Sequence, residues 1–431
     1  MALKATEEVK THQPGLSVRI QADCPEEFMA AVTNLVSKGT GFPAIHNDSV
    51  GYQMLINAGY EPEDARDWNN CGCVVPHYRK TGEWTAAVNV NFGSALEYAL
   101  NEGKSRMTGE QMGLPEKPSR EFVSYEEVEK AFYRQFANLC KHSVIATIEA
   151  QKLHQEMVPR PFLSSCIESC LETGKDLSQG GAKYNVGPVI TGIGLAVASN
   201  SLAVIKKLVF EDRETTMEEL DRALSADWEG YEELRKKARE VPKYGNDDDY
   251  VDEIAIKIGK AGITRRSISI RMYLDRPLTR RLWESQTIFR WEESWRRLPA
   301  DGKTASRPAK GYPPMWAVTS QHRWQPCGRR PKSTREIHSG GTLLNLRLNH
   351  ELVATRRGQA NLGAMIQAFF ALGAFHVQFN TLSSEVLRRA QEKPEDYKDL
   401  LVRVAGYSTQ FVNLSKSMQD AIIARTEHAE F

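Results

Sequence analysis

Two closely spaced cysteines are the first residues whose types and spacing suggest chemistry. Cys71 and Cys73 flank Gly72, and a Val-Val-Pro run follows them. A thiol between glycine and proline suits a tight loop that projects it into a cavity, where a thiolate can act as a nucleophile or redox group. The spacing fits a buried structural thiol as well, so both interpretations stay open.

A structural zinc site is a third interpretation of these cysteines, with Cys166 and Cys170 as the remaining two of its four ligands. The spacing of four residues predicts that Cys166 and Cys170 face the same side of a helix. The surrounding sequence PFLSSCIESC is more typical of an apolar helix start than of a zinc knuckle, which argues against a zinc site.

Gly406, inside the run RVAGYS at residues 403–408, is the second chemical candidate. A glycine between a strand-like run and a helix is usually a turn residue that needs a positive φ. Glycine has a second property, because its α-carbon can become planar without crowding from a side chain. A planar α-carbon delocalises an unpaired electron into the flanking carbonyl and amide groups, so this glycine is also suited to store a radical.

A glycine-dense segment, DLSQGGAKYN at residues 176–185, is the third candidate. It lacks the Gly-Lys-Ser/Thr ending of a phosphate loop and the strand–GxGxxG–helix context of a dinucleotide site. We therefore expect these glycines to allow close backbone packing.

The composition is that of a globular protein. Of the 431 residues, 41% are hydrophobic and 26% are charged, with a net charge of +1. Such a balance gives no indication of binding to nucleic acid or to an anionic membrane. The polar N-terminus and the seven cysteines, an odd number, predict a cytoplasmic protein with reduced thiols.

The hydrophobic pattern predicts helices that alternate with short isolated strands, which indicates an α/β architecture. The expected helices are 25–38, 49–58, 124–157, 196–209, 218–238, 360–372 and 411–425, and residues 61–65 carry a helix start signal. The expected strands are 16–20, 88–92, 376–380 and 400–404.

The stretch 276–335 differs from the rest of the chain. It carries eleven arginines and three lysines against four acids, and five of the eight tryptophans. A surface for an anionic partner and a long irregular insertion are two interpretations. We favour a third, that the stretch is not coding sequence in the native reading frame, because the segments on both sides recover a coherent pattern.

Several stretches together resemble the glycyl radical enzyme, or pyruvate formate-lyase, family. RVAGYS resembles the radical loop of the family and GCVVP at 72–76 its cysteine loop. Further resemblances, in the family's order, are GFPAIHND at 41–48, ARDW at 65–68, DLSQGGAKYN and YGNDDDYVDEIA at 244–255. The resemblance covers residues 15–275 and 338–431.

The resemblance implies a fold and its boundaries. The chain is expected to be the second half of a ten-stranded α/β barrel, with a C-terminal glycyl radical loop that meets the cysteine loop inside. Residues 1–340 would form the partial barrel domain, with 276–335 anomalous, and residues 341–431 the glycyl radical domain. Because the first half of the barrel is missing, we expect the chain alone to be inactive.

The resemblance also implies the chemistry. Gly406 would store the radical and Cys73 would be the catalytic thiol, with Cys71 and His77 as auxiliary candidates and Tyr78 and Trp84 near the pocket. The remaining residues of the radical loop would be Arg403, Val404, Ala405, Tyr407 and Ser408. No cofactor would be bound, since an activating enzyme with S-adenosylmethionine and an iron–sulfur cluster installs the radical. The implied setting is an anaerobic cytoplasm, with a homodimer, small accessory subunits and a small-molecule substrate.

Val75 bears on the substrate, because dehydratase and eliminase members carry a glutamate two residues after the catalytic cysteine. Valine cannot act as a general base, and Gly72 separates the two cysteines that are adjacent in pyruvate-cleaving members. We therefore expect decarboxylation of an arylacetate, ahead of hydrocarbon addition to fumarate, elimination by a dehydratase or C–N lyase, and formate acetyl transfer. An inactive fragment and a metal-binding module are the alternatives from other classes.

Overall fold

In the computed structural model, the described residues are 1–72, 74–78, 87–184, 189–246, 248–260, 289–292, 344–404, 406–423 and 427–428. The chain divides into two compact units. Unit 1 consists of residues 1–78 and 319–431, and unit 2 of residues 79–318. Both candidate loops therefore belong to unit 1.

A mixed five-stranded sheet forms the centre of unit 1, with the order β1-β2-β9-β8-β12. Strands β1 and β2 are parallel, β9 runs antiparallel to β2, and β8 and β12 are parallel to β9 and to β8 respectively. The bounds are β1 Ser17–Ile20, β2 Ala44–Asn47, β8 Asn345–Leu348, β9 His376–Asn380 and β12 Glu427–His428. Strands β1 and β9 confirm two of the four strands that the sequence predicted, those at 16–20 and 376–380.

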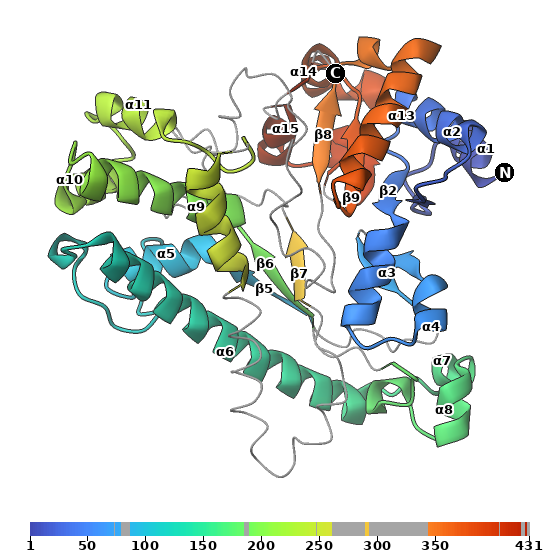
Figure 1. The fold of residues 1–431 in the computed structure, drawn as a ribbon, viewed down its shortest axis with the longest axis horizontal. Helices are drawn as coiled ribbons and strands as arrows, with labels where there is room; N and C mark the ends of the chain where they lie inside the picture. Colours follow the sequence, from blue (N-terminus) through green and yellow to red (C-terminus); the bar gives the residue numbers. More distant parts are fainter. Residues whose placement is uncertain are drawn as a thin grey trace. The chain divides into compact units, whose positions relative to one another are not determined.

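Two helices cover this sheet with a shared apolar core. Helix α2 (Glu26–Ser37) and helix α13 (Arg356–Ala371) pack against each other, and their buried side chains share one cluster with those of the strands. Gly363 permits the contact, since a Cβ there would lie 2.9 Å from Met29 Cγ. The described residues of unit 1 also include the α-helices α1 Ala2–Val9, α3 Asp48–Asn57, α4 Pro62–Arg66, α14 Ser384–Glu392 and α15 Lys416–Ile423 (Figure 1).

Unit 2 contains a parallel sheet in the order β5-β6-β7. Its strands are β5 Ala87–Asn91, β6 Val189–Ile193 and β7 Phe289–Glu292. Strand β7 belongs to the Arg/Trp-rich stretch, where the sequence showed no strand period; the rest of residues 276–335 lies outside the described residues.

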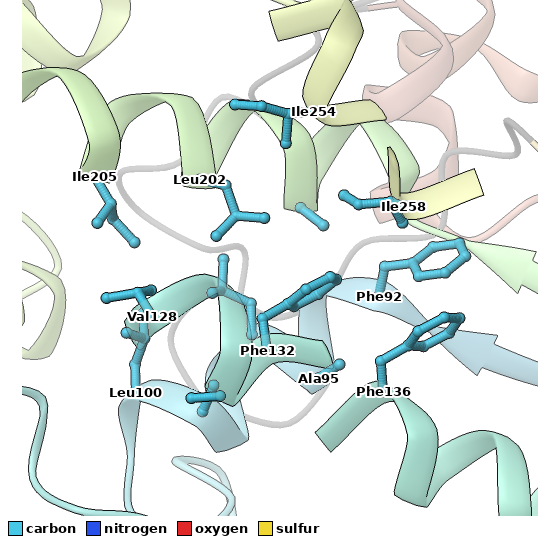
Figure 2. Packing of buried hydrophobic residues seen from close by; sticks show 14 of the residues in the cluster. Phe92, Ala95, Leu100, Val128, Phe132, Phe136, Leu202, Ile205, Ile254 and Ile258 are labelled. Atoms are coloured by element: carbon cyan, nitrogen blue, oxygen red, sulfur yellow. The ribbon is translucent and has the colours of Figure 1, made fainter. Parts of the chain in front are cut away.

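The core of unit 2 lies between helices. Helix α5 (Phe92–Leu100), the long helix α6 (Tyr125–Met157), helix α9 (Leu195–Val204) and helical residues 249–260 contribute its side chains. Figure 2 shows Phe132 and Phe136 of α6 beside Phe92, with Leu202 and Ile258 above them in this view. Ser124 caps α6 by accepting a hydrogen bond from the Glu127 N–H, and this helix confirms the prediction for 124–157.

The helix predicted at 218–238 is wrong as a single element. Helix α10 (Met217–Ser225) and helix α11 (Glu232–Glu240) replace it. Between them Asp227 and Trp228 adopt left-handed φ angles of 49° and 66°, and the Trp228 side chain is buried in the core. The burial of this large ring outweighs the continuous helical pattern.

Two other predicted helices change character along their length. Helix α9 continues as a π-helix, Ile205–Glu211, and the segment predicted at 411–425 consists of the 3-10 turn Phe411–Asn413 followed by α15. Across the described residues, no helix combines the length and apolar character that a membrane crossing needs.

The glycine-dense segment after residue 175 packs closely, as the sequence predicts. Gly181 leaves no room for a side chain, because a Cβ there would overlap the Lys175 carbonyl oxygen and lie 2.8 Å from Cys170 Sγ. Asp176 organises the same segment, accepting hydrogen bonds from the N–H groups of Arg160 and Ser178 and from the Ser164 hydroxyl.

Candidate functional site

Gly406 lies in a short hairpin, called here the Gly406 hairpin, formed by β10 (Leu401–Arg403) and β11 (Ser408–Gln410). Arg403 pairs with Ser408, and the Val404 N–H donates to the Tyr407 carbonyl at 2.9 Å. Gly406 has a φ of +83°, which favours glycine. The prediction of a turn glycine is thus confirmed, while Ala405 lies outside the described residues.

The Arg403 side chain is buried beneath this hairpin. Its Nε donates to Gln378 Oε1 at 2.6 Å, a terminal nitrogen donates to Ser408 Oγ at 3.4 Å, and the guanidinium lies 5.3 Å from the centre of the Phe42 ring. Arg403 is only 3% exposed, so these contacts take the place of water around a buried cation. The Tyr407 side chain, in contrast, is exposed.

Gly41, which precedes β2, lies directly against the Gly406 hairpin. A Cβ at Gly41 would be 2.8 Å from Arg403 Cβ and 3.1 Å from both the Arg403 nitrogen and Ser408 Oγ. Gly41 also has a φ of +74°. The start of the GFPAIHND segment therefore forms part of the surface on which the hairpin rests.

The cysteine loop lies on a second hairpin, called here the cysteine hairpin, formed by β3 (Asn69–Cys71) and β4 (Val75–His77). Cys71 pairs with Val75, and Gly72 has a φ of +65°. Cys73, between them in the sequence, lies outside the described residues, as does Trp84. Val75 and Tyr78 are buried, and His77 is half-buried.

A cluster of three residues supports the start of the cysteine hairpin. Trp68, which precedes β3, donates from Nε1 to Asp48 Oδ1 at 3.0 Å, and Arg19 donates from Nε to the same carboxylate at 2.6 Å. Arg19 also donates to the Trp68 carbonyl oxygen, and its guanidinium lies 4.7 Å from the centre of the Trp68 ring. Trp68 is 1% exposed, so the chain is fixed where the hairpin begins.

The cysteine hairpin runs back along β1 from this cluster. The Trp68 carbonyl contacts Arg19, whereas the Asn70 side chain donates to Ser17 Oγ at 3.2 Å, two residues earlier in β1. Ser17 is in register with Ala44, the first residue of β2. The hairpin thus leads toward the end of β2 that Gly41 precedes.

Both hairpins are consequently anchored at the same end of the β1–β2 pair. The Gly406 hairpin rests on Gly41, and Asn70 of the cysteine hairpin reaches Ser17 beside Ala44. The GFPAIHND and ARDW segments are evident in the sequence, whereas the individual roles of Arg19, Asp48 and Trp68 are not. The signal was a polar residue directly after a buried strand and an aromatic residue directly before a hairpin.

The four-cysteine zinc site gains no support from the geometry of the described residues. Cys166 is exposed at the end of helix α7 (Pro161–Ser165), while Cys170 is buried in helix α8 (Glu168–Thr173). The helix breaks between them, so the prediction that they share a helix face is wrong. Among the described side chains, no three metal-binding groups lie close enough together to hold an ion.

Comparison with known families decides the assignment. A family model described as pyruvate formate lyase-like matches residues 1–279, and a glycine radical model matches residues 330–412. The chain belongs to the glycyl radical enzyme family. The second match includes the hairpin that carries Gly406.

Relatives of this family match almost the whole chain. The chain is 33% identical to trans-4-hydroxy-L-proline dehydratase of Clostridioides difficile, across 99% of this chain and 54% of that protein. The structure of the B12-independent glycerol dehydratase of Clostridium butyricum matches with a TM-score of 0.83 and 33% identity, across 100% of this chain and 54% of that one. Indoleacetate decarboxylase of Tractidigestivibacter scatoligenes matches at 26% identity, across 99% of this chain and 52% of that protein.

These matches establish the fold class. The chain has the mixed α/β fold of the pyruvate formate lyase-like barrel, followed by a C-terminal glycine radical domain. It spans about half the length of the relatives it matches.

Proposed function

We propose that the complete protein is a glycyl radical lyase in which Gly406 stores the radical and Cys73 transfers it to the substrate. The observation that carries this proposal is the common anchoring of the two hairpins at one end of the β1–β2 pair. The φ of +83° at Gly406 favours glycine at this position, and glycine is the residue that the proposed radical storage requires.

The proposed steps are hydrogen-atom transfers. An activating enzyme that uses S-adenosylmethionine and an iron–sulfur cluster first removes one hydrogen atom from the Gly406 α-carbon. The α-carbon then takes a hydrogen atom from the Cys73 thiol, so that an S–H bond breaks and a C–H bond forms. The sulfur radical abstracts hydrogen from a substrate carbon, and the same hydrogen returns when the product radical has formed. The two hairpins must therefore bring the α-carbon and the sulfur within reach of each other.

For the substrate, we propose elimination of water from a small hydroxylated molecule. The relatives that are 33% identical are named as dehydratases. Such a reaction requires a group that accepts the hydroxyl proton, and the buried Val75 cannot supply it. His77 follows Val75 by two residues on β4, so it lies on the same face of the strand. We assign it the role of proton acceptor.

Decarboxylation of an arylacetate is the second candidate. Val75 favours it, because an apolar residue beside the thiol suits a substrate with no hydroxyl group to deprotonate. Cys71, at the opposite position of the hairpin, would be the second thiol near the substrate carboxylate. The 26% match to indoleacetate decarboxylase agrees with this alternative.

One experiment separates these candidates and tests the role of Cys73. The activated full-length protein is assayed under anaerobic conditions with trans-4-hydroxy-L-proline, glycerol and indoleacetate. We expect loss of water from a hydroxylated substrate, a strongly reduced rate in His77→Gln, and no turnover in Cys73→Ser, because a hydroxyl O–H bond is too strong for the glycyl radical to break.

Cys71→Ser is the matched control and should retain more activity than Cys73→Ser. Complete and equal loss in both cysteine variants would contradict a single transferring thiol, since residues that act as a unit lose activity together. Release of carbon dioxide from indoleacetate without any dehydration would favour the second candidate.

We also propose the domain boundaries 1–340 and 341–431, with residues 276–335 as an anomalous stretch. The two family matches leave residues 280–329 unmatched, and that interval falls inside the Arg/Trp-rich stretch. We propose that this stretch is not coding sequence in the native reading frame. Sequencing the gene and translating it in the neighbouring frame tests this proposal. A barrel-like sequence in another frame is the expected result, and an uninterrupted frame confirmed by mass spectrometry of the peptides would contradict it.

We also propose partners and a cellular location for the complete protein. The partners are the activating enzyme, a second copy of the complete protein and small accessory subunits. Oxygen would react with the radical at Gly406 and cleave the chain, so we propose an anaerobic cytoplasm as the location.

A further inference from the structure

The Gly406 hairpin forms a two-stranded sheet of its own, separate from the five-stranded sheet of unit 1. Its strands β10 and β11 have only three residues each. An isolated hairpin of this size has marginal stability in water. The contacts that attach it to the rest of unit 1 therefore determine where Gly406 lies.

One side chain attaches the hairpin to the large sheet through the backbone. Asn380, the last residue of β9, accepts a hydrogen bond from the Arg403 N–H on Oδ1 at 2.8 Å. Its Nδ2 donates to the Arg403 carbonyl oxygen, also at 2.8 Å. In an antiparallel sheet a neighbouring strand supplies this same pair of hydrogen bonds to one residue. The Asn380 amide thus takes the place of a strand at a single position.

The surroundings make this attachment specific to asparagine. Asn380 is 5% exposed and Arg403 is 3% exposed, so an unsatisfied backbone group here would be buried without water. Only an amide side chain of this length offers both an acceptor and a donor at neutral pH. Gln378, two residues earlier on β9, accepts a hydrogen bond from the Arg403 side chain. Its amide group also donates a hydrogen bond to Asn345 of β8.

The fixed residue is close to the radical position. Arg403 precedes Gly406 by three residues, and the Val404 to Tyr407 hydrogen bond stiffens the segment between them. A shift of the Arg403 backbone would therefore displace the Gly406 α-carbon. Small displacements of reacting groups, of about 1 Å, reduce rates by about two orders of magnitude.

We propose that Asn380 is a positioning residue for Gly406, holding the Gly406 hairpin in the place from which the α-carbon exchanges hydrogen with the thiol. This inference rests on the proposed radical function. Asn380 contacts the backbone of Arg403 and acts on the reaction only through the hairpin.

The matched control is Asn47, at the end of β2 in the same sheet. Asn47 is 4% exposed, and its Nδ2 also donates to backbone carbonyls, those of Phe370 at 2.9 Å and Ala374 at 2.8 Å. Asn380→Leu and Asn47→Leu each remove a buried amide, which makes two side-chain hydrogen bonds at Asn380 and three at Asn47, where the Ser49 hydroxyl also donates to Oδ1. Only the first removes hydrogen bonds to the backbone of the Gly406 hairpin.

The experiment measures turnover per glycyl radical in the full-length protein, with the radical counted by electron paramagnetic resonance, together with hydrogen exchange of the amides in residues 401–410. We expect Asn380→Leu to lower turnover per radical by about ten- to hundredfold and to speed exchange in the hairpin. Asn47→Leu should keep turnover per radical within about twofold of the wild type and leave hairpin exchange unchanged. A purely structural role would lower the amount of folded protein and radical, but not turnover per radical.

The proposal is overturned if Asn380→Leu keeps wild-type turnover per radical, or if its hairpin exchange matches that of Asn47→Leu. Should Asn380→Leu fail to fold, Asn380→Asp replaces it, because the carboxylate keeps the acceptor for the Arg403 N–H and loses the donor to the carbonyl. A fall in turnover per radical is again the expected result, and an unchanged value overturns the proposal. If the wild type itself gives no radical signal, the proposed function fails, and hydrogen exchange still decides whether Asn380 holds the hairpin.

Discussion

Gly41→Ala should weaken the support of the Gly406 hairpin through two separable effects. The first is backbone strain, because Gly41 has a φ of +74°. A residue with a side chain costs about 1–2 kcal/mol in this left-handed region. The second is overlap, because the new methyl group would lie 2.8 Å from Arg403 Cβ and 3.1 Å from the Arg403 nitrogen. The nitrogen belongs to the backbone, so the hairpin itself must move.

Gly39→Ala isolates the strain from the overlap. Gly39 has the same φ of +74°, and a Cβ there would meet Leu382 Cδ2 at 3.4 Å, an ordinary van der Waals contact. We expect Gly39→Ala to lower the free energy of unfolding by about 1–2 kcal/mol. Overpacking adds about 1–3 kcal/mol, so Gly41→Ala should lower it by about 2–5 kcal/mol in total.

Urea unfolding followed by far-UV circular dichroism measures both free energies. Turnover per glycyl radical gives the functional consequence, which we expect to fall in Gly41→Ala and to stay near the wild-type value in Gly39→Ala. The reasoning is refuted if Gly41→Ala is as stable as Gly39→Ala, because the close approach to Arg403 would then carry no energetic weight.

Two further predictions concern pH. Burial lowers the pKa of Lys243 to about 8, against about 10.4 in the unfolded chain, so the folded state loses its proton first and stability relative to Lys243→Met should rise between pH 8 and 10.4, by about 2–3 kcal/mol. Urea unfolding of both proteins across that range is the measurement, and parallel curves would contradict the prediction. Burial on its own would raise the pKa of Asp176, but hydrogen bonds from Ser178, Ser164 and Arg160 outweigh it and hold the pKa below its usual value. The stabilising contribution of Asp176 should therefore be present above about pH 4 and be lost as the pH falls further, so that the stability gap to Asp176→Asn narrows in acid; a gap that widens would refute this.

The sequence predicted the elements whose pattern is local and long. Helix α6 follows from a sustained apolar period that begins at a serine cap, and α2 ends before a glycine with positive φ. The prediction of one continuous helix over 218–238 failed because the burial of Trp228, a tertiary effect, decided the backbone conformation there. Strands β2 and β8 have four residues each and are too short to show a distinct hydrophobic pattern in the sequence.

The candidate site was predictable in its motifs and not in its supports. RVAGYS and GCVVP could be read directly, since each is a contiguous run. The contacts that hold them join residues far apart in the sequence, such as Arg19 with Trp68 and Asn380 with Arg403. No periodicity links such pairs, because only the sheet brings them together.

The electron paramagnetic resonance spectrum of the activated full-length protein tests the central claim most directly. Incubation with the activating enzyme under anaerobic conditions should give a doublet, since the one hydrogen left on the Gly406 α-carbon splits the signal. Gly406→Ala should abolish the doublet, because a methyl group crowds the planar radical and does not fit the φ of +83°. Cys73→Ser should keep it. A doublet that survives Gly406→Ala would contradict the assignment of Gly406 as the radical store.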